Sequence, residues 1–496
     1  MRIETNSAVT SAEPLATLAT LQGGAQQSAS LYVIFISAIA ALGGFLFGFD
    51  SGVINGTVTA LSQAFQSDSV ATGFNVASVL LGCAVGALVA GPLADRYGRK
   101  PVMIITALVF AISAWGSGDA QSATAFILYR VFGGLGIGAA SVLAPAYIAE
   151  VAPAHLRGRL ATLQQLAIVL GLFAAFVSNY LIASVAGSAQ ALFWFDLPAW
   201  RWMFWVELVP SVLFFIGVFF IPESPRFLVG KGDFKRAQQV FARINGAGSN
   251  QISSAHAEFA SQQIAEVQQS LSGQPKHGFR DLWVAGSRKL QPIVWVGIAL
   301  SVFQQFVGIN VVFYYGAELW QAAGFAESES LFINVLAGTT NIVSTFIAIA
   351  LIDKIGRKPL LMIGSIGMAI SLGMLTLIFA NAGFADSGKL ALTAQMGTLA
   401  LVMANLFVVF FGISWGPVVW VLLGEIFNNR IRGAALALAA SAQWLANFAI
   451  SMSFPVLLSS VGLAGAYGFY TASAVISIFF VWRYVKETRG KTLEVM

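Results

Sequence analysis

The chain of 496 residues has few charged side chains. Asp, Glu, Lys and Arg make up only 10 % of it, whereas a soluble domain carries about 25 %. Hydrophobic residues make up 57 %, and the mean hydropathy is +0.78. So few charges cannot cover the surface of a water-soluble body of this size. The composition therefore excludes a soluble enzyme, a disordered protein and a nucleic-acid-binding domain.

Cysteine is almost absent, since Cys83 is the single one in the chain. A lone cysteine excludes an intramolecular disulfide and a thiolate metal cluster. The three histidines all fall in polar connections between apolar stretches. Residues 383–389 nearly match a phosphate-binding loop, but Leu390 follows where Ser or Thr would bind magnesium. The sequence therefore predicts no metal site, no cofactor and no ATP-driven pump.

Apolar stretches recur along the whole chain. Each is close to the ~20 residues that a helix needs to cross ~30 Å of hydrocarbon. Helices are expected because every backbone polar group must be satisfied within the bilayer. The twelve predicted spans cover residues 31–63, 71–93, 101–118, 124–148, 159–184, 201–221, 291–320, 330–352, 359–381, 396–424, 433–459 and 465–485.

The basic residues set the expected orientation. If the N-terminus is inside, all of the 27 Lys and Arg residues except Arg130, Arg201 and Lys389 fall in connections on the cytoplasmic side. Residues 1–30 are polar and lack the pattern of a signal peptide, so we expect a cytoplasmic tail there. A second cytoplasmic tail is expected at residues 486–496.

Two motifs occur twice at matched positions. Asp-basic-x-Gly-Arg-Lys-Pro stands at residues 95–101 and again at 353–359, and a Glu precedes Arg-Gly by seven residues in each half. These repeats predict an all-α membrane protein with two pseudo-symmetric six-helix halves and a pathway between them. The predicted halves are residues 31–221 and 291–485. Residues 222–290 between them are expected to form a short intracellular helical linker.

Charged residues of the repeated motifs and their neighbours are expected to form a cytoplasmic latch that holds the halves together when the site faces outward. An alternative is that they only anchor loops and fix the topology. The latch residues are Asp95, Arg99, Glu150, Arg157, Glu223, Arg226, Asp353, Arg357, Glu425 and Arg432.

Further motifs carry a family resemblance. They are Pro-Glu-Ser-Pro-Arg at 222–226, Gln-Gln-Phe-Val-Gly-Ile-Asn at 304–310, Trp-Gly-Pro at 415–417 and Glu-Thr-Arg-Gly at 487–490. With the duplicated loop, they resemble the sugar porter branch of the major facilitator superfamily over about residues 31–494. The sequence is most similar to bacterial glucose and other hexose or pentose proton symporters. The resemblance implies a monosaccharide and protons as ligands, the bacterial inner membrane as location, and a functional monomer without nucleic acid.

The resemblance also implies a sugar site made of amides and aromatic rings. Amide groups both donate and accept hydrogen bonds, as sugar hydroxyls do, and aromatic faces cover the apolar C–H surface. Each amide could instead be a hydrogen-bond link between helices, and each ring could simply pack or face lipid. The matching positions are Gln165, Gln304, Gln305, Asn310, Asn341, Gln443, Phe47, Trp420 and Trp444.

Three ionisable residues, Asp50, Arg130 and Glu207, lie inside predicted spans, where charge is costly. The resemblance implies that Asp50 and Arg130 form a pair linked to proton coupling. Beside Arg130 the carboxylate should stay ionised, and away from it the carboxyl should take up a proton. A purely structural ion pair is the alternative. For Glu207, a second proton relay and a partnership with Arg201 are both open.

Alternating access is the expected mechanism, with split helices in spans seven and ten. Glycines in both spans and Pro417 would ease the splits, and Tyr314 and Tyr315 would close over the sugar from outside. A proton-coupled sugar symporter is the favoured interpretation, and a passive facilitator is the alternative. The tails are short for a sugar sensor, and no catalytic constellation indicates an enzyme.

Overall fold

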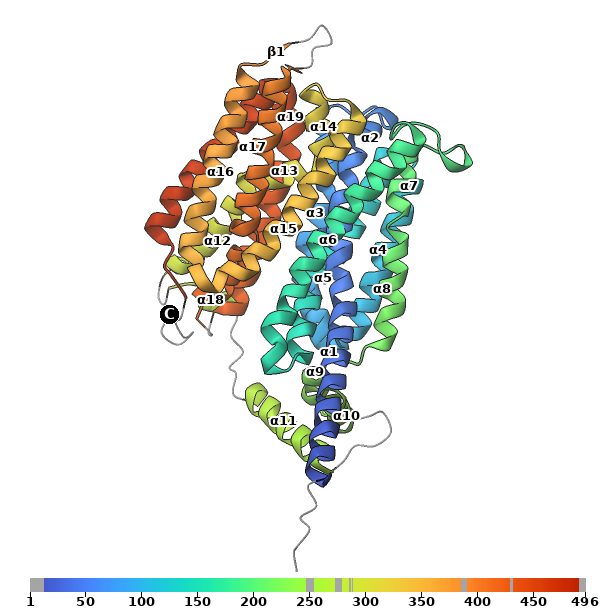
Figure 1. The fold of residues 1–496 in the computed structure, drawn as a ribbon, viewed down its shortest axis with the longest axis vertical. Helices are drawn as coiled ribbons and strands as arrows, with labels where there is room; N and C mark the ends of the chain where they lie inside the picture. The colour runs from blue at the N-terminus through green and yellow to red at the C-terminus, as the bar shows by residue number, and fades with distance from the viewer. Residues whose placement is uncertain are drawn as a thin grey trace, which may run out of the picture.

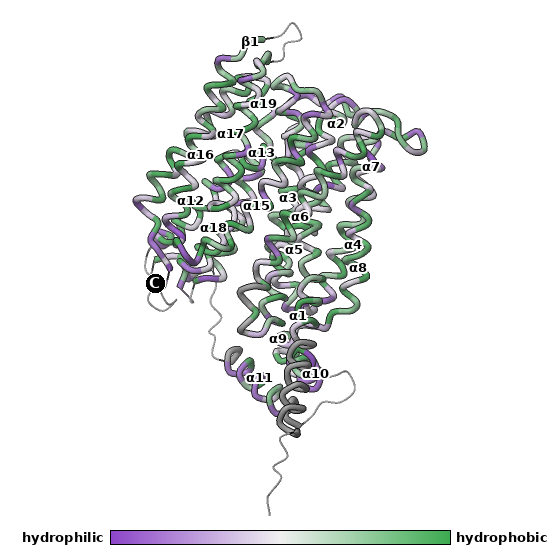
Figure 2. Tube along the Cα trace, in the orientation of Figure 1, coloured by the Kyte–Doolittle hydropathy of each residue, from purple (hydrophilic) through white to green (hydrophobic). Residues whose placement is uncertain are grey.

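The computed structural model describes residues 13–246, 254–272, 279–284, 287, 289–384, 390–428 and 431–489. Two helical bundles stand side by side, one from each half of the chain, and α9, α10 and α11 lie below the N-terminal bundle near the start of α1 (Figure 1). Apolar residues dominate both bundles, and polar residues gather at their ends and in α10 and α11 (Figure 2).

The N-terminal bundle and the linker follow the expected order. The bundle contains α1 (Glu13–Val53), η1 (Ile54–Gly56), α2 (Val58–Ala64), α3 (Ser69–Tyr97), α4 (Arg99–Asp119), α5 (Ala123–Val151), α6 (Ala154–Ala186), η2 (Trp194–Asp196), α7 (Ala199–Trp205) and α8 (Leu208–Phe220). The linker contains α9 (Pro225–Gly230), α10 (Phe234–Ile244), α11 (Ser254–Ser272) and η3 (Phe279–Leu282).

The C-terminal bundle has more breaks. It contains α12 (Pro292–Phe306), α13 (Ile309–Tyr314), α14 (Gly316–Ala322), α15 (Glu327–Ile355), α16 (Arg357–Ala380), β1 (Gly383–Phe384), β2 (Leu390–Ala391), α17 (Ala394–Ile413), α18 (Trp415–Ile426) and α19 (Arg432–Tyr484). The two short strands pair antiparallel in the connection between α16 and α17.

Eleven helical stretches in the described residues are long and apolar enough to cross a membrane. One of them, α19, has 53 residues and covers two predicted spans. Its backbone leaves the helical conformation at Gly462, where φ is 69° and ψ is −177°. This break divides α19 into the two expected spans, so the structure agrees with the twelve-span fold.

Four predicted spans are interrupted, among them the sixth, which divides into α7 and α8 at Val206 and Glu207. The first does not run unbroken to residue 63, because α1 ends at Val53 and η1 and α2 follow. The seventh divides into α12, α13 and α14, with Gly308 in the left-handed region at φ 84°. The tenth divides at Ser414, where φ is −132° and ψ is −89°. Broken helices expose backbone groups at membrane depth, which is tolerated where they line a site within the protein.

The two halves contact each other at the end of the bundle opposite the Gly98 and Gly356 turns. Phe74 of α3 packs edge-on against Phe448 of α19 at 6.3 Å between ring centroids. Tyr180 of α6 lies 5.7 Å from Phe332 of α15. These contacts close the seam between the halves at that end.

Candidate functional site between the halves

A buried ion pair joins α1 and α5 in the middle of the N-terminal bundle. Nη1 of Arg130 donates to Oδ1 of Asp50 at 2.6 Å, and both residues are 1 % exposed. Glu207, between α7 and α8, is 0 % exposed. Asp50 Oδ2 and both Glu207 oxygens have no hydrogen-bond partner among the described residues. A second buried carboxyl group, that of Glu207, thus lies near the Asp50–Arg130 pair, whose charges act on it.

Arg201 and Glu207 have different surroundings. Arg201 donates to the carbonyl oxygen of Gly118 at 2.7 Å and to Gln121 at 3.4 Å. The charged groups that act on Glu207 are Asp50 and Arg130. Glu207 therefore lies near the Asp50–Arg130 pair. Arg201 instead binds the connection between α4 and α5.

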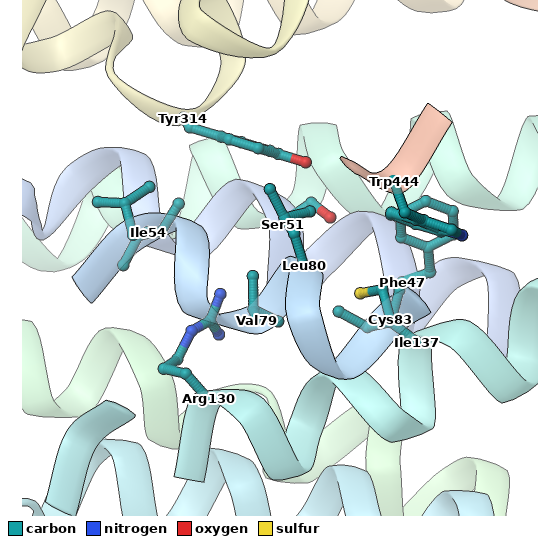
Figure 3. Close-up of a pocket in the computed structure, with 11 residues that line it drawn as sticks. Phe47, Ser51, Ile54, Val79, Leu80, Cys83, Arg130, Ile137, Tyr314 and Trp444 are labelled. Carbon is teal, nitrogen blue, oxygen red and sulfur yellow. The ribbon is translucent and has the colours of Figure 1, made fainter. Parts of the chain in front are cut away.

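A small cavity, with a volume of about 10 Å³, lies against this ion pair. Arg130 borders it from below in Figure 3, Tyr314 crosses above it, and Phe47 and Trp444 stand together at one side. The Phe47 and Trp444 rings belong to different halves and lie 5.8 Å apart. The cavity therefore lies between the halves, with aromatic residues from both. Its lining consists of Phe47, Ser51, Ile54, Val76, Val79, Leu80, Cys83, Arg130, Ile137, Tyr314 and Trp444.

Four of the six predicted amides form one hydrogen-bonded network in the C-terminal bundle. Gln304 Nε2 donates to the carbonyl oxygens of Trp415 at 2.7 Å and Gly416 at 3.2 Å. Gln304 Oε1 accepts from Gln443 at 2.6 Å and from Gln305 at 3.3 Å. Asn310 donates to Gln305 Oε1. The network spans the breaks in spans seven and ten, because Gln304 binds the first turn of α18 and Asn310 lies in the first turn of α13.

The other predicted sugar-site residues lie outside this network. Gln165 is half-buried on α6, and its neighbour Gln164 is buried with neither amide atom partnered among the described residues. Asn341 is buried on α15, close to Gly412 of α17. Trp420 of α18 is 43 % exposed and does not line the cavity.

The predicted gate residues occupy different positions. Tyr314 lines the cavity, and its hydroxyl accepts a hydrogen bond from Asn447 Nδ2 at 3.3 Å. Tyr315, the next residue, is fully buried and does not line the cavity. Its hydroxyl donates to the carbonyl oxygen of Ser451 at 2.7 Å. Pro417 lies in the first turn of α18, just after the break at Ser414.

The predicted latch forms two matching clusters. In the N-terminal half, Arg99 binds Glu150 with two hydrogen bonds of 3.1 and 3.0 Å and pairs with Asp95 at 3.0 Å. Glu223 accepts from the backbone nitrogens of Arg99 at 2.8 Å and Lys100 at 3.2 Å. Glu223 therefore caps the start of α4, whose first N–H groups have no partner within the helix.

The C-terminal half repeats this arrangement. Arg357 binds Glu425 at 3.0 and 2.8 Å and pairs with Asp353 at 3.0 Å. Glu487 accepts from the backbone nitrogens of Arg357 at 3.1 Å and Lys358 at 3.0 Å. Glu487 was missed as a cluster residue, although Glu-Thr at 487–488 after the last span parallels Glu-Ser at 223–224 after the sixth.

The two capping carboxylates differ in their electrostatics. Burial raises the pKa of Glu223 above its ordinary value, although the backbone of Ser224, Arg99 and Lys100 and the charge of Arg99 oppose the shift. For Glu487, burial acts in the same direction but is outweighed by hydrogen bonds from the backbone of Arg489, Arg357, Lys358 and Thr488. Its pKa is therefore lowered.

The remaining latch residues do not join the two clusters. Arg226 is exposed, and Arg432 donates to the carbonyl oxygen of Phe427 at 3.3 Å. The Arg157 side chain lies outside the described part of the chain. Every ion pair found among the described side chains lies within one half or within the linker, and none joins the halves. In this conformation the expected latch between halves is therefore not formed from these pairs.

A two-half bundle of twelve spans, with buried ionisable groups in one half, an amide network in the other and aromatic residues between them, defines a membrane transport protein. No group of three or more His, Cys, Asp or Glu in the described residues is placed to hold a metal ion. The model of the sugar (and other) transporter family matches residues 36–496. The chain belongs to this family and is a multi-pass membrane protein.

Relatives extend over nearly the whole chain. A glucose transport protein of Synechocystis sp. is 54 % identical over 94 % of this chain and 97 % of its own length. The D-xylose-proton symporter of Escherichia coli is 38 % identical over 94 % of this chain and 95 % of its own. The partially occluded inward-open structure of the Escherichia coli xylose transporter is 35 % identical, with a TM-score of 0.78 over 93 % of this chain and 99 % of that one.

Proposed function

We propose that the protein is a secondary active transporter that imports a monosaccharide together with a proton by alternating access. Glucose is the foremost candidate substrate, because the relative at 54 % identity is named a glucose transport protein. Proton coupling is supported by the relative at 38 % identity, which is named a D-xylose-proton symporter. The observation that carries the proposal is the group of Asp50, Arg130 and Glu207 beside the cavity.

The charge of this group requires a proton. With Arg130 cationic and both carboxyl groups ionised, the site would hold one unbalanced negative charge in a buried region. Burying an unpaired charge is strongly unfavourable. One proton on Asp50 or Glu207 restores neutrality and supplies a donor for the unpartnered carboxyl oxygens. Because Asp50 also holds Arg130 at the cavity edge, proton binding and the shape of the sugar site are linked.

The sugar site is proposed to lie between the Gln304 network and the Phe47–Trp444 pair. Gln443 Oε1 is buried without a partner among the described residues, so it is free to accept from a sugar hydroxyl. Gln305, Asn310, Gln165 and Asn341 are proposed to add further contacts. Trp444 and Phe47 would cover the apolar face of the ring. Trp420 would reach the sugar only after α18 moves, since it does not line the present cavity.

In alternating access, the Arg99 and Arg357 clusters would act at the cytoplasmic end of the two halves. The seam is closed opposite the basic end, and the positive-inside rule makes the basic end cytoplasmic. The conformation is therefore proposed to be inward-facing, with Tyr314 over the sugar site. Outward opening would bring the Arg99 and Arg357 clusters together as the predicted latch. We propose that the protein lies in a bacterial inner membrane with both termini in the cytoplasm, and that it acts as a monomer and not as an enzyme.

Counterflow in proteoliposomes tests the substrate. Vesicles loaded with unlabelled glucose, galactose or xylose are diluted into labelled sugar at low concentration. The proposal predicts transient accumulation with glucose and loss of accumulation in Gln304→Ala. Accumulation with none of the three sugars would contradict the monosaccharide assignment. Glucose exchange without proton movement would instead support a passive facilitator.

A further inference from the structure

Asn55 makes a buried polar connection between the halves that the transport mechanism above does not use. It lies in η1, directly after α1 ends, and is 1 % exposed. Its Nδ2 donates to the carbonyl oxygen of Phe313 at 2.9 Å. Its Oδ1 accepts from the backbone nitrogen of Ala317 at 3.1 Å and from Asn334 Nδ2 at 2.8 Å. All three partners belong to the C-terminal half.

The local backbone is shaped around this side chain. A Cβ on Gly316 would lie 2.1 Å from Asn334 Oδ1 and 2.9 Å from Asn55 Nδ2. A side chain there would therefore displace the asparagines. The break between α13 and α14 at Tyr315 also frees the amide of Ala317 from the helical pattern, so that it can donate to Asn55. The side-chain amide of Asn55 thus links the broken end of α1 to the broken span seven.

We infer that Asn55 is a positioning residue that clasps the outer gate in its closed conformation. Its partners Phe313 and Ala317 flank Tyr314 and Tyr315, so the clasp fixes the segment that carries Tyr314 over the cavity. The outer side cannot open while these three hydrogen bonds join the halves. Opening must therefore break them, and their loss should favour the outward-open conformation. This inference rests on the proposed alternating-access function.

The chain supplies a matched control in Asn179 of α6. It is 0 % exposed, and its Nδ2 donates to the carbonyl oxygens of Gly52 at 3.4 Å and Val53 at 3.0 Å. It therefore holds the same broken end of α1 as Asn55 does. Its bonds, however, lie within the N-terminal half. Asn179→Ala should weaken the fold without altering the balance between inward-facing and outward-facing conformations.

Side-specific labelling tests the clasp in the full-length protein. Phe74→Cys in a Cys83→Ser background places one thiol at the closed outer seam, and a membrane-impermeant maleimide is added outside right-side-out vesicles. Adding Asn55→Ala should speed labelling by about fivefold or more, since hydrogen bonds made in one conformation only are lost. Asn334→Ala, which removes one of the three bonds, should give a smaller increase. Asn179→Ala should leave the rate unchanged.

The outcomes separate the clasp from general stability and from the transport proposal. Equal acceleration by Asn55→Ala and Asn179→Ala, or no acceleration by Asn55→Ala and Asn334→Ala, would overturn the clasp. If Asn55→Ala does not fold, Asn334→Ala alone decides. Glucose counterflow is measured on the wild type in parallel. Absence of counterflow would count against the proposed function, while the labelling would still decide the role of Asn55.

Discussion

Arg130 donates a 2.6 Å hydrogen bond to Oδ1 of Asp50, whereas Oδ2 of Asp50 has no donor among the described residues. The nearby Glu207 carboxyl is equally unsatisfied. A purely structural ion pair would be expected to satisfy both oxygens of its carboxylate, because unpaired buried polar atoms are costly. The unpartnered oxygens support the proposed proton site, which would gain and lose a proton while the protein changes conformation.

Glu207→Gln removes one of the two carboxyl groups and keeps the side-chain shape. The charges of Arg130 and Asp50 then cancel without a bound proton. We therefore expect glucose exchange to persist while proton uptake per sugar falls. The measurement is internal acidification of proteoliposomes alongside counterflow. Ser211→Ala, one helical turn further along α8, changes a buried hydroxyl without changing charge and should leave the ratio unaltered. Unchanged proton uptake in Glu207→Gln would remove Glu207 from the coupling site.

Gln304→Ala should have a large effect on sugar affinity. Gln304 links Gln305 and Gln443 and also holds the first turn of α18. Losing these hydrogen bonds should cost about 1–3 kcal/mol, which raises the Kd for glucose by roughly 5- to 150-fold. Glucose titration of intrinsic tryptophan fluorescence measures this Kd, because Trp444 lines the cavity. Asn405→Ala serves as the control, since this amide binds Thr340 outside the network. Equal Kd values for both variants would contradict a sugar site at Gln304.

Gly98→Ala should destabilise the N-terminal half. Gly98 has φ 103° and ψ 163°, a region adopted almost only by glycine, and a residue with a side chain there pays about 1–3 kcal/mol. A Cβ there would also lie 2.2 Å from Glu223 Oε2 and would displace the cap of α4. Gly91→Ala is the matched control, because nothing lies within 4 Å of its added Cβ. Thermal unfolding in detergent should show a lower Tm for Gly98→Ala only. Equal Tm values for the two variants would show that the cap adds no stability.

Glu223 and Glu487 should respond to pH in opposite directions. The pKa of Glu487 is lowered by folding, so its contribution to stability is present at neutral pH and is lost as the pH falls through the folded pKa. The advantage of the wild type over Glu487→Gln should therefore shrink toward about pH 4. The pKa of Glu223 is raised, so its contribution is fully present below the unfolded pKa and is lost as the pH rises. The advantage over Glu223→Gln should grow as the pH falls.

Tm values of the wild type and both variants between about pH 4 and pH 8 test this prediction. If the Tm difference between wild type and variant changed with pH in the same direction for Glu223→Gln and Glu487→Gln, burial would not distinguish the two capping carboxylates.

The fold followed from the sequence because bilayer physics leaves few choices. Hydropathy and the repeated Gly-Arg-Lys-Pro turns predicted the spans and the halves, and Gly308 and Pro417 pointed to the broken helices. The break after Val53 was not predicted, because η1 and α2 continue an apolar pattern that is also compatible with one long helix. The role of Glu487 was likewise missed, since a helix cap from a distant segment has no local periodicity.

Side-chain partners were less predictable than positions. The sequence placed six amides in the spans, but it could not separate the connected network around Gln304 from Gln165 and Asn341. Whether an amide joins the network depends on the orientation of each helix segment after its break. Similarly, Asn55 is an ordinary polar residue near a span end in the sequence. Only the folded chain brings it to Phe313, Ala317 and Asn334.

The most direct test of the account is sugar-driven proton movement. The purified protein is reconstituted in liposomes with a pH-sensitive dye inside, and glucose is added outside without an imposed gradient. We predict glucose-dependent internal acidification by the wild type, and its loss in Asp50→Asn with counterflow exchange retained. Glucose exchange with no acidification by the wild type would contradict symport and leave the Asp50–Arg130 pair with a structural or gating role.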